Sequence, residues 1–249
     1  MTGTGRARGA RGRLGRTLSS LTAVVGCVLF LGGFVWAAVL YQPYAVPSDS
    51  MVPTVNAGDR ILVQRVDGDQ VRRGDIVVFR DPAWGELPMI KRVVGVGGDT
   101  VECCDKEGRL TLNGEALDEP YLRRDEQASF TDFEAAVPEG RLFLLGDHRI
   151  DSVDSRMHLE DAANGSVERD AVVGRVDAVV WPPARAGMTE RPRSFADLPG
   201  GVSRPGPLGS AAAAIAGGVA LILVGAVAGA ITAVRGRRAR LTHNGGTHG

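Results

Sequence analysis

Two long apolar runs limit the folds that this chain can adopt. Leu21–Tyr41 and Ala211–Val234 contain no charged residue. Each run is about as long as the ~20 residues that a helix needs to cross a bilayer. Trp36 lies towards the far end of the first run, where interfacial aromatic side chains are common. We therefore expect one transmembrane helix near each end of the chain.

Each run has an alternative interpretation. The first could be a cleavable signal peptide, but the apolar region of a signal peptide is only ~7–15 residues long, and no convincing small-x-small site follows directly. The second could be a buried Ala/Gly-rich helix, which its charge-free length and the basic stop after it disfavour.

The charges are distributed unevenly along the chain. The 29 basic and 29 acidic residues cancel, yet no acidic residue precedes Asp49 or follows Asp197. Arginines gather just outside the two runs, so the positive-inside bias places both termini in the cytoplasm and the middle outside. The middle is acidic, which argues against nucleic-acid binding. The arginines of the two ends are Arg6, Arg8, Arg11, Arg13, Arg16, Arg235, Arg237, Arg238 and Arg240.

The part between the runs reads as a mainly β domain. Short β-branched segments such as Ile61–Val63 and Ile76–Phe79 follow Gly-Asp turns, and no convincing amphipathic helix occurs there. We expect six parts along the chain: a basic cytoplasmic tail at 1–19, a transmembrane helix at 20–41, an extracytoplasmic β domain carrying the chemistry at 42–188, a Gly/Pro-rich linker at 189–210, a transmembrane helix at 211–234 and a basic cytoplasmic tail at 235–249.

The cysteines do not indicate a metal site. Cys27 lies inside the first apolar run, where it serves as a small apolar residue. Cys103 and Cys104 are adjacent in an oxidising compartment, which leaves open both a vicinal disulfide and two separate thiols. No cluster of His, Cys, Asp and Glu has ligand spacing, so we expect neither a metal nor an organic cofactor.

Ser48 and Ser50 follow the first apolar run closely and are the first candidates for chemistry. If this segment is extended, both hydroxyls point to the same face, one able to attack and the other to donate a hydrogen bond. Pro47 and Pro53 restrict the backbone on either side. The alternative is a Ser/Pro-rich linker that leaves a membrane.

Lys91 is the candidate base. Of the 29 basic residues only Lys91 and Lys106 are lysines. An arginine cannot lose its proton in a protein, whereas burial lowers the pKa of a lysine and lets it act as a general base. Lys91 lies in an apolar segment, but Lys106 lies in a polar turn. The alternative for Lys91 is a side chain that reaches out to water.

Histidine is the weaker candidate for the base. His243 and His248 lie in the expected cytoplasmic tail, which leaves His148 and His158 outside. A Ser-His arrangement through His148 therefore stays open as an alternative.

Five short motifs follow one another along the chain: Pro-Ser-x-Ser-Met-x-Pro-Thr at 47–54, Gly-Asp-x-x-x-Val at 58–63, Arg-Gly-Asp-Ile-Val at 73–77, Lys-Arg-Val-x-Gly-x-x-Gly-Asp at 91–99 and Gly-Asp-x-Arg-x-x-Ser-x-Asp-Ser-Arg at 146–156. In this order they resemble the motifs of the type I signal peptidases, which are membrane-bound serine proteases with a Ser-Lys dyad. The additional carboxy-terminal span is similar to that of some actinobacterial members.

The resemblance implies an antiparallel β fold, a plasma-membrane location and a role for each matching residue. Ser50 matches the nucleophile and Lys91 the general base. Ser48 matches the oxyanion donor, and Ser152 the serine that orients the lysine. Asp147, Arg149, Asp154 and Arg156 match positions expected to give buried ionic support, and the expected lining of the substrate pockets is Val46, Pro47, Met51, Val55 and Ile90.

Three positions depart from the family pattern. His148 stands where asparagine is usual, Met157-His158-Leu159 replaces an aromatic-Gly pair, and Val167-Glu168 replaces a common Val-Pro. These departures concern the loop after the last motif and leave the expected dyad intact.

The sequence thus predicts an endopeptidase that removes signal peptides from exported preproteins after small-x-small (Ala-x-Ala) sites. Its expected partners are signal-peptide-bearing preproteins, membrane lipid and, by proximity, the secretion translocon, with no nucleic acid.

One competing interpretation is a catalytically inactive membrane-anchored β binding module. Another is a self-cleaving Ser-Lys protease like the SOS-response repressors, which the two spans and the lack of a helix-turn-helix disfavour.

Overall fold

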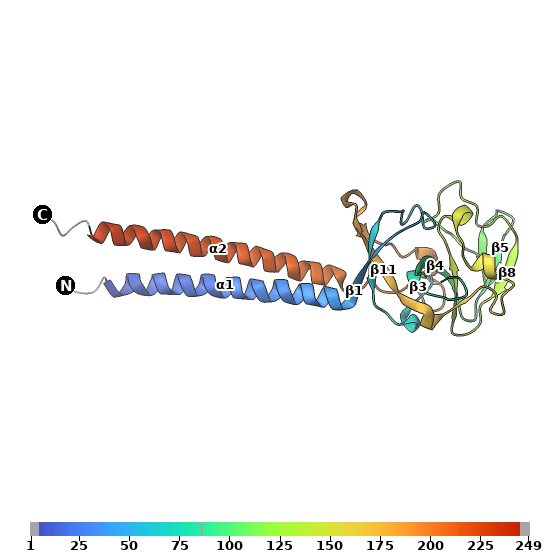
Figure 1. The fold of residues 1–249 in the computed structure, drawn as a ribbon, viewed down its shortest axis with the longest axis horizontal. Coiled ribbons are helices and arrows are strands. Elements are labelled where there is room, and N and C mark those ends of the chain that lie inside the picture. The colour runs from blue at the N-terminus through green and yellow to red at the C-terminus, as the bar shows by residue number, and fades with distance from the viewer. Residues whose placement is uncertain (1–4, 86, 245–249) are drawn as a thin grey trace. The chain divides into compact units, whose positions relative to one another are not determined.

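The structure is a computed structural model that describes residues 5–85 and 87–244. The expected tails at 1–19 and 235–249 lie partly outside these residues. The chain forms two compact units, a β unit at Leu40–Gly206 and a helical unit from the two ends. In order, the helices and strands are α1 Gly5–Leu40, β1 Tyr41–Ala45, β2 Arg60–Gln64, β3 Ile76–Phe79, β4 Met89–Val96, β5 Thr100–Cys103, β6 Leu110–Leu112, β7 Glu115–Ala116, β8 Phe133–Ala136, β9 Arg141–Leu145, β10 Val167–Glu168, β11 Val172–Trp181, β12 Gly187–Met188 and α2 Leu208–Asn244 (Figure 1).

The β unit contains two antiparallel sheets. The larger has the order β1-β2-β11-β3-β4-β9-β10, with β12 paired to β11, and the smaller has the order β7-β6-β5-β8. Every strand pair is antiparallel. The prediction of a mainly antiparallel β fold is therefore confirmed.

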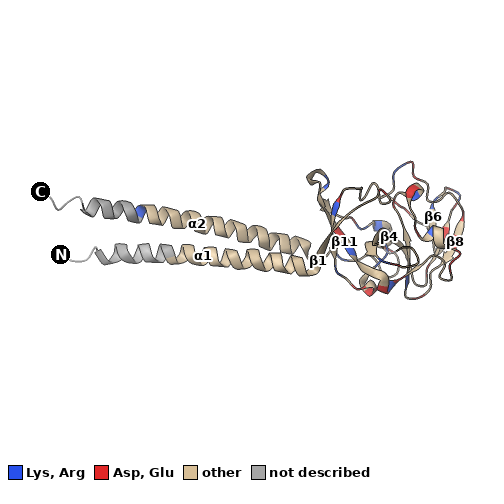
Figure 2. Cartoon of the chain, in the orientation of Figure 1, with Lys and Arg blue, Asp and Glu red and all other residues tan. Residues whose placement is uncertain are grey.

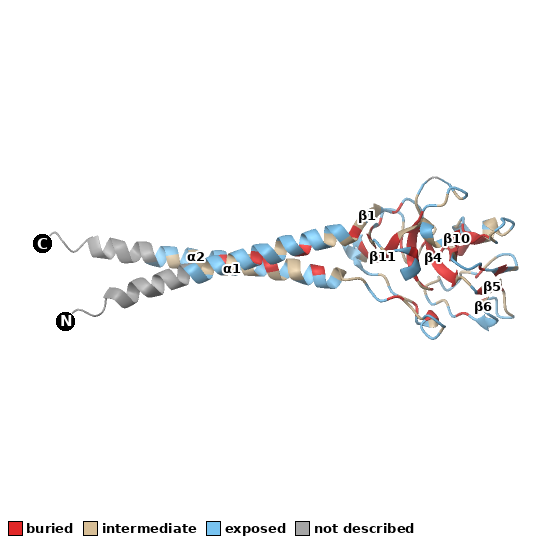
Figure 3. Cartoon of the chain, turned by 90° about the horizontal axis from the view of Figure 1, so that it is seen from below, coloured by how far each residue is buried: buried red, intermediate tan, exposed pale blue. Residues whose placement is uncertain are grey.

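The larger sheet is covered on both faces, which explains its continuous apolar strands. Along β3, Ile76 and Val78 pack into one buried cluster, while Val77 and Phe79 pack into another. Successive side chains of a strand point to opposite faces, so a strand covered on both sides must be apolar throughout. The buried colouring of β4 and β11 in Figure 3 marks the same region.

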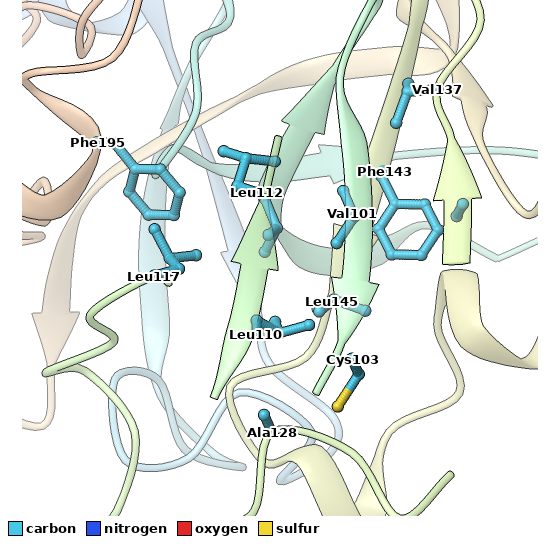
Figure 4. Close-up of a cluster of buried hydrophobic side chains, with 12 residues drawn as sticks. Val101, Cys103, Leu110, Leu112, Leu117, Ala128, Val137, Phe143, Leu145 and Phe195 are labelled. Carbon is cyan, nitrogen blue, oxygen red and sulfur yellow. The ribbon is translucent and has the colours of Figure 1, made fainter. Parts of the chain in front are cut away.

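The smaller sheet packs its own core against β9. Val101, Leu110, Leu112 and Phe143 are all fully or almost fully buried in one cluster, shown as sticks in Figure 4. At the end of β5, Cys103 and Cys104 are joined in a vicinal disulfide, which is one of the two alternatives left open by the sequence.

The segment after β12 is packed, although its composition predicts a linker at 189–210. The β unit extends to Gly206, and Phe195 is fully buried. Ser203 donates a hydrogen bond to the buried carboxylate of Asp75, and Arg73 donates one to the carbonyl of Pro199 at 2.6 Å. Glycine, proline and serine predict irregular backbone, but they do not exclude long-range side-chain contacts that fix it.

The two long helices form the other unit and run antiparallel to each other. Their apolar stretches, Thr17–Leu40 and Leu208–Arg235, are long enough to cross a membrane. These stretches are uncharged apart from Arg235 at the end of the second (Figure 2). At the crossing, a Cβ added to Gly26 would come within 2.8 Å of the Gly218 carbonyl oxygen. Small residues at such crossings let helix backbones approach closely.

We predict that Gly174→Ala destabilises the β unit. Gly174 lies on β11 beside β2, and an added Cβ would come within 2.3 Å of the backbone carbonyl oxygen of Gln64. Backbone cannot move aside as a side chain can, so the cost should be about 1–3 kcal/mol of unfolding free energy. The matched control is Gly187→Ala on β12, whose added Cβ meets nothing within 4 Å.

Denaturant unfolding of the detergent-solubilised full chain measures both variants. Equal stability of the two variants would contradict the close β11–β2 approach.

Candidate active site

Ser48 and Ser50 lie just after β1, on a segment that bends where the sequence suggested an extended one. The amide of Val52 donates to the carbonyl of Asp49 at 3.0 Å, so the chain turns at Ser50. The two hydroxyls nevertheless face each other, with the Oγ atoms 3.4 Å apart. The predicted pair of hydroxyls is therefore present, positioned by a turn.

Lys91 comes from β4 and meets Ser50 across 41 residues of sequence. Its Nζ lies 3.0 Å from Ser50 Oγ and 3.1 Å from the carbonyl oxygen of Ile90. The residue is buried, with 4% of its surface exposed. Burial lowers the pKa of this amine, and the nearby carboxylates Asp154 and Asp147 oppose that shift only partly. The amine is thus held against the hydroxyl in a setting that favours its neutral form.

Ser152 lines the same groove, but its hydroxyl is not bonded to the lysine. Ser152 Oγ is buried and has no hydrogen-bond partner among the described residues. It lies against Gly146, where an added Cβ would come within 2.1 Å of this oxygen. Ser152 is therefore close to the dyad with its hydrogen-bonding capacity unused.

A buried ion pair supports the turn that carries Ser50. Asp147 accepts two hydrogen bonds from the Arg92 guanidinium, at 2.8 and 2.6 Å, and a third from Thr54 Oγ1 at 2.5 Å. The next amide, of His148, donates to the carbonyl of Ser50 at 3.1 Å. The loop after β9 thus holds the serine segment from both ends.

Two further ion pairs fix the loop itself. The Arg156 guanidinium donates two hydrogen bonds to the Asp154 carboxylate, which also accepts one from the amide of Gly146 at 3.0 Å. Arg149 is paired with Glu119 and donates to the Gly146 carbonyl at 3.0 Å. The four residues expected to give ionic support all lie in this network, and Glu119 is a partner that the sequence did not indicate.

The groove beside the dyad has a volume of about 490 Å³. Four of the five residues expected to line it do so: Val46, Pro47, Met51 and Ile90. Val55 does not, because its side chain is fully buried in the core beneath the groove.

The sequence missed part of the lining. The additional side chains are Pro88, Met89, Ile150, Asp151, Val153 and Met157. They come from the start of β4 and from the loop after β9. The only sequence signal was the position of these residues next to matched motifs.

The family model described as signal peptidase, peptidase S26, matches residues 16–181. This chain belongs to that family. A probable signal peptidase I of Mycobacterium leprae is 31% identical over 226 residues, covering 68% of this chain and 77% of the relative. Signal peptidase I of Mycobacterium tuberculosis is 32% identical over 222 residues, covering 68% and 74%. A crystal structure of a signal peptidase I from Enterococcus faecalis is 32% identical, covers 42% of this chain and 94% of that chain, and gives a TM-score of 0.34.

Membership of the peptidase S26 family makes the chain a serine endopeptidase. The family is membrane-anchored, and the two apolar helices are compatible with that. At His148, where the family resemblance implied asparagine, Nδ1 is buried without a hydrogen-bond partner in the described part of the chain. The contact that His148 makes with the serine segment uses its backbone amide, so the departure leaves that contact in place.

We predict that Asp147→Ala destabilises the β unit by about 3–5 kcal/mol, because it leaves the buried guanidinium of Arg92 without its partner. The control is Glu168→Ala, which breaks the exposed pair with Arg141 and should cost at most about 1 kcal/mol. Denaturant unfolding measures both, and equal losses would show that the Arg92–Asp147 pair is not effectively buried.

Proposed function

We propose that this chain removes amino-terminal signal peptides from exported preproteins after small-x-small (Ala-x-Ala) sites, with Ser50 as nucleophile and Lys91 as general base. The observation that carries the proposal is the 3.0 Å contact between Lys91 Nζ and Ser50 Oγ, made by a lysine residue that is 4% exposed. The named relatives are signal peptidases, which supports the substrate class.

The reaction begins with proton transfer from the serine hydroxyl. Neutral Lys91 takes the proton from Ser50 Oγ as this oxygen attacks the scissile carbonyl carbon. The C–N bond then breaks, and the lysine returns the proton to the departing amine. In the second half, Lys91 takes a proton from a water that attacks the acyl ester. The bond between the carbonyl carbon and Ser50 Oγ then breaks, and the lysine returns the proton to Ser50 Oγ.

The negative charge on the carbonyl oxygen needs donors that are already in place. Ser48 Oγ lies 3.4 Å from Ser50 Oγ and, with the backbone N–H of Ser50, supplies two of them. Loss of one such donor typically lowers the rate by ~10²–10³. Ser152 has a buried, unused hydroxyl beside the dyad, and we assign it the orientation of the lysine ammonium formed during the reaction.

The substrate enters as an extended strand beside the start of β4. β3 covers one edge of Met89–Lys91, whereas β9 pairs with β4 only from Arg92 onwards. The other edge of Met89–Lys91 therefore has no strand partner among the described residues, and a peptide can add there. The groove is lined mainly by apolar side chains close to the dyad, which suits small substrate residues.

We place α1 and α2 in the plasma membrane, with both termini cytoplasmic and the β unit outside. Their antiparallel arrangement brings the start of α1 and the end of α2 to one side (Figure 1), and the flanking arginines favour the cytoplasm. Exposed Ile150, Val153 and Met157 at the groove offer an apolar surface to membrane lipid. Proximity to the secretion translocon follows from the substrate.

We predict that Ser50→Ala and Lys91→Met each lower preprotein processing by at least ~10⁴-fold, because the nucleophile and base act as a unit. Lys91→Arg should be equally inactive, since a guanidinium keeps its proton. The control is Lys106→Met, which removes the other lysine, in the polar turn after Cys104, and should process at the wild-type rate.

The measurement is cleavage of a preprotein with an Ala-x-Ala site in detergent and lipid. Activity in Lys91→Arg would show that this amine is not the base.

We predict an acidic limb in the pH dependence of kcat/KM, because only the neutral amine of Lys91 accepts the proton. Burial lowers the pKa of Lys91 below its ordinary value, so the limb should lie below that value and activity should rise as pH increases through it.

The same lowered pKa predicts a pH-dependent stability. At Lys91 the folded state binds fewer protons than the unfolded state. Stability should therefore increase with pH between the folded and unfolded pKa values, and Lys91→Met should remove that dependence.

A pH profile of wild type and His148→Asn tests the origin of the limb. Its disappearance in His148→Asn would assign the limb to the histidine.

A further inference from the structure

We propose that the segment 189–206, here called the C-terminal strap, positions the Ser50–Lys91 pair, and that Phe195 is the positioning residue through which it acts. The inference rests on the proposed function. The strap lies beyond the residues that match the family model, which end at 181. It is therefore an element of this chain that the family assignment does not explain.

The strap holds all three residues of the turn at Arg73–Asp75. Arg73 Nη1 donates to the carbonyl of Pro199 at 2.6 Å. Gly74 has a φ of +83°, and an added Cβ there would come within 2.9 Å of the ring of Phe195. Asp75, which is 2% exposed, accepts a hydrogen bond from Ser203. Each of the three turn residues therefore contacts or closely approaches a residue of the strap.

The same turn holds β4 next to Lys91. The amide of Gly74 donates to the carbonyl of Val93 at 2.8 Å, and the amide of Val93 donates to the carbonyl of Asp75 at 2.8 Å. Arg92 Nη1 donates to the carbonyl of Gly74 at 2.8 Å. Lys91 is the neighbour of Arg92 on the strand, so a shift of the turn moves the strand that carries the amine.

Phe195 reaches the ion pair beneath the serine segment by a second route. Its ring lies 6.5 Å from that of Tyr121, measured between centroids, and the Arg92 guanidinium lies 4.0 Å above the Tyr121 ring. Arg92 in turn binds Asp147, which accepts the hydroxyl of Thr54. Phe195 is thus connected to Lys91 through the turn at Arg73–Asp75, and to the Ser50 segment through Tyr121, Arg92 and Asp147. Figure 4 shows its ring next to Leu112 and Leu117.

The strap is fixed at both of its ends. Arg191 donates to Asp177 at 2.6 Å, and the amide of Gly206 donates to the other oxygen of the same carboxylate at 3.1 Å. Asp177 lies on β11 and is fully buried. The strap contains no regular strand or long helix, so these hydrogen bonds at its two ends are what hold Phe195 in the core.

The test uses Phe195→Ala in the full chain, with Phe195→Leu as the conservative variant and Phe130→Ala as the matched control. Phe130 is 68% exposed. Because small misplacements of catalytic groups can cost ~10²-fold in rate, we expect Phe195→Ala to lower kcat by ~10–100-fold with a much smaller change in KM. Its acidic limb in kcat/KM should move, Phe195→Leu should recover most of the loss, and Phe130→Ala should match wild type.

Rates are measured at temperatures where thermal unfolding shows each variant to be folded. If Phe195→Ala does not fold, Phe195→Leu and Ser203→Ala decide, with an expected loss of a few-fold in kcat and a moved limb. An unchanged kcat and pH profile in folded variants would overturn the proposal, as would a loss that only follows the fraction unfolded.

Hydrogen exchange separates this inference from the proposed function. In Phe195→Ala, peptides covering 73–77 and 89–96 should exchange ~10-fold faster or more, while those of the β1–β2 pair keep the wild-type rate. If wild type does not cleave a preprotein but this pattern is seen, the proposed function fails and the strap's hold on β4 stands. If wild type cleaves and the pattern is absent, the inference fails alone.

Discussion

The candidate site depends on a buried lysine amine that has no direct carboxylate partner. Asp147 and Asp154 are close enough to Lys91 to oppose the lowering of its pKa. Each of them is nevertheless hydrogen-bonded to its own arginine, Arg92 and Arg156 respectively. If either carboxylate formed a direct ion pair with Lys91, the pair would keep the lysine charged. If the two carboxylates lay elsewhere, the buried Arg92 and Arg156 would have no partners. The amine is therefore bonded to the serine hydroxyl and a backbone carbonyl.

That arrangement explains why so many charges are buried around a site whose chemistry needs few of them. The pairs Arg92–Asp147, Arg149–Glu119 and Arg156–Asp154 all have side chains that are at most 10% exposed. Buried ion pairs are weak evidence for net stability, because desolvation offsets their attraction. Their hydrogen bonds to backbone and hydroxyl groups of the serine segment and the loop indicate that they fix geometry.

The sequence predicted the features that depend on local residue chemistry and on the order of motifs along the chain. Two expected apolar helices, the antiparallel β fold and the meeting of Ser50 with Lys91 agree with the structure. Other features depend on contacts between distant residues, for which the sequence held no local signal. Glu119 lies 30 residues from Arg149, and Phe195 reaches its core from a segment of turn-forming composition. The family resemblance implied that Val55 lines the groove, but the chain turns at Ser50 and Val55 packs in the core.

The close crossing of α1 and α2 makes the two apolar helices a matched pair. At Gly218 an added Cβ would lie 2.5 Å from the amide nitrogen of Phe30, and at Gly33 it would lie 3.1 Å from the Cβ of Ala214. In lipid, hydrophobicity alone does not bring two helices together. Close van der Waals packing between helices, which small residues allow, stabilises the pair instead. A foreign helix of equal length and apolarity in place of α1 would thus keep its hydrophobicity but lose the close backbone contacts at Gly26 and Gly33, so α2 would have no matched neighbour.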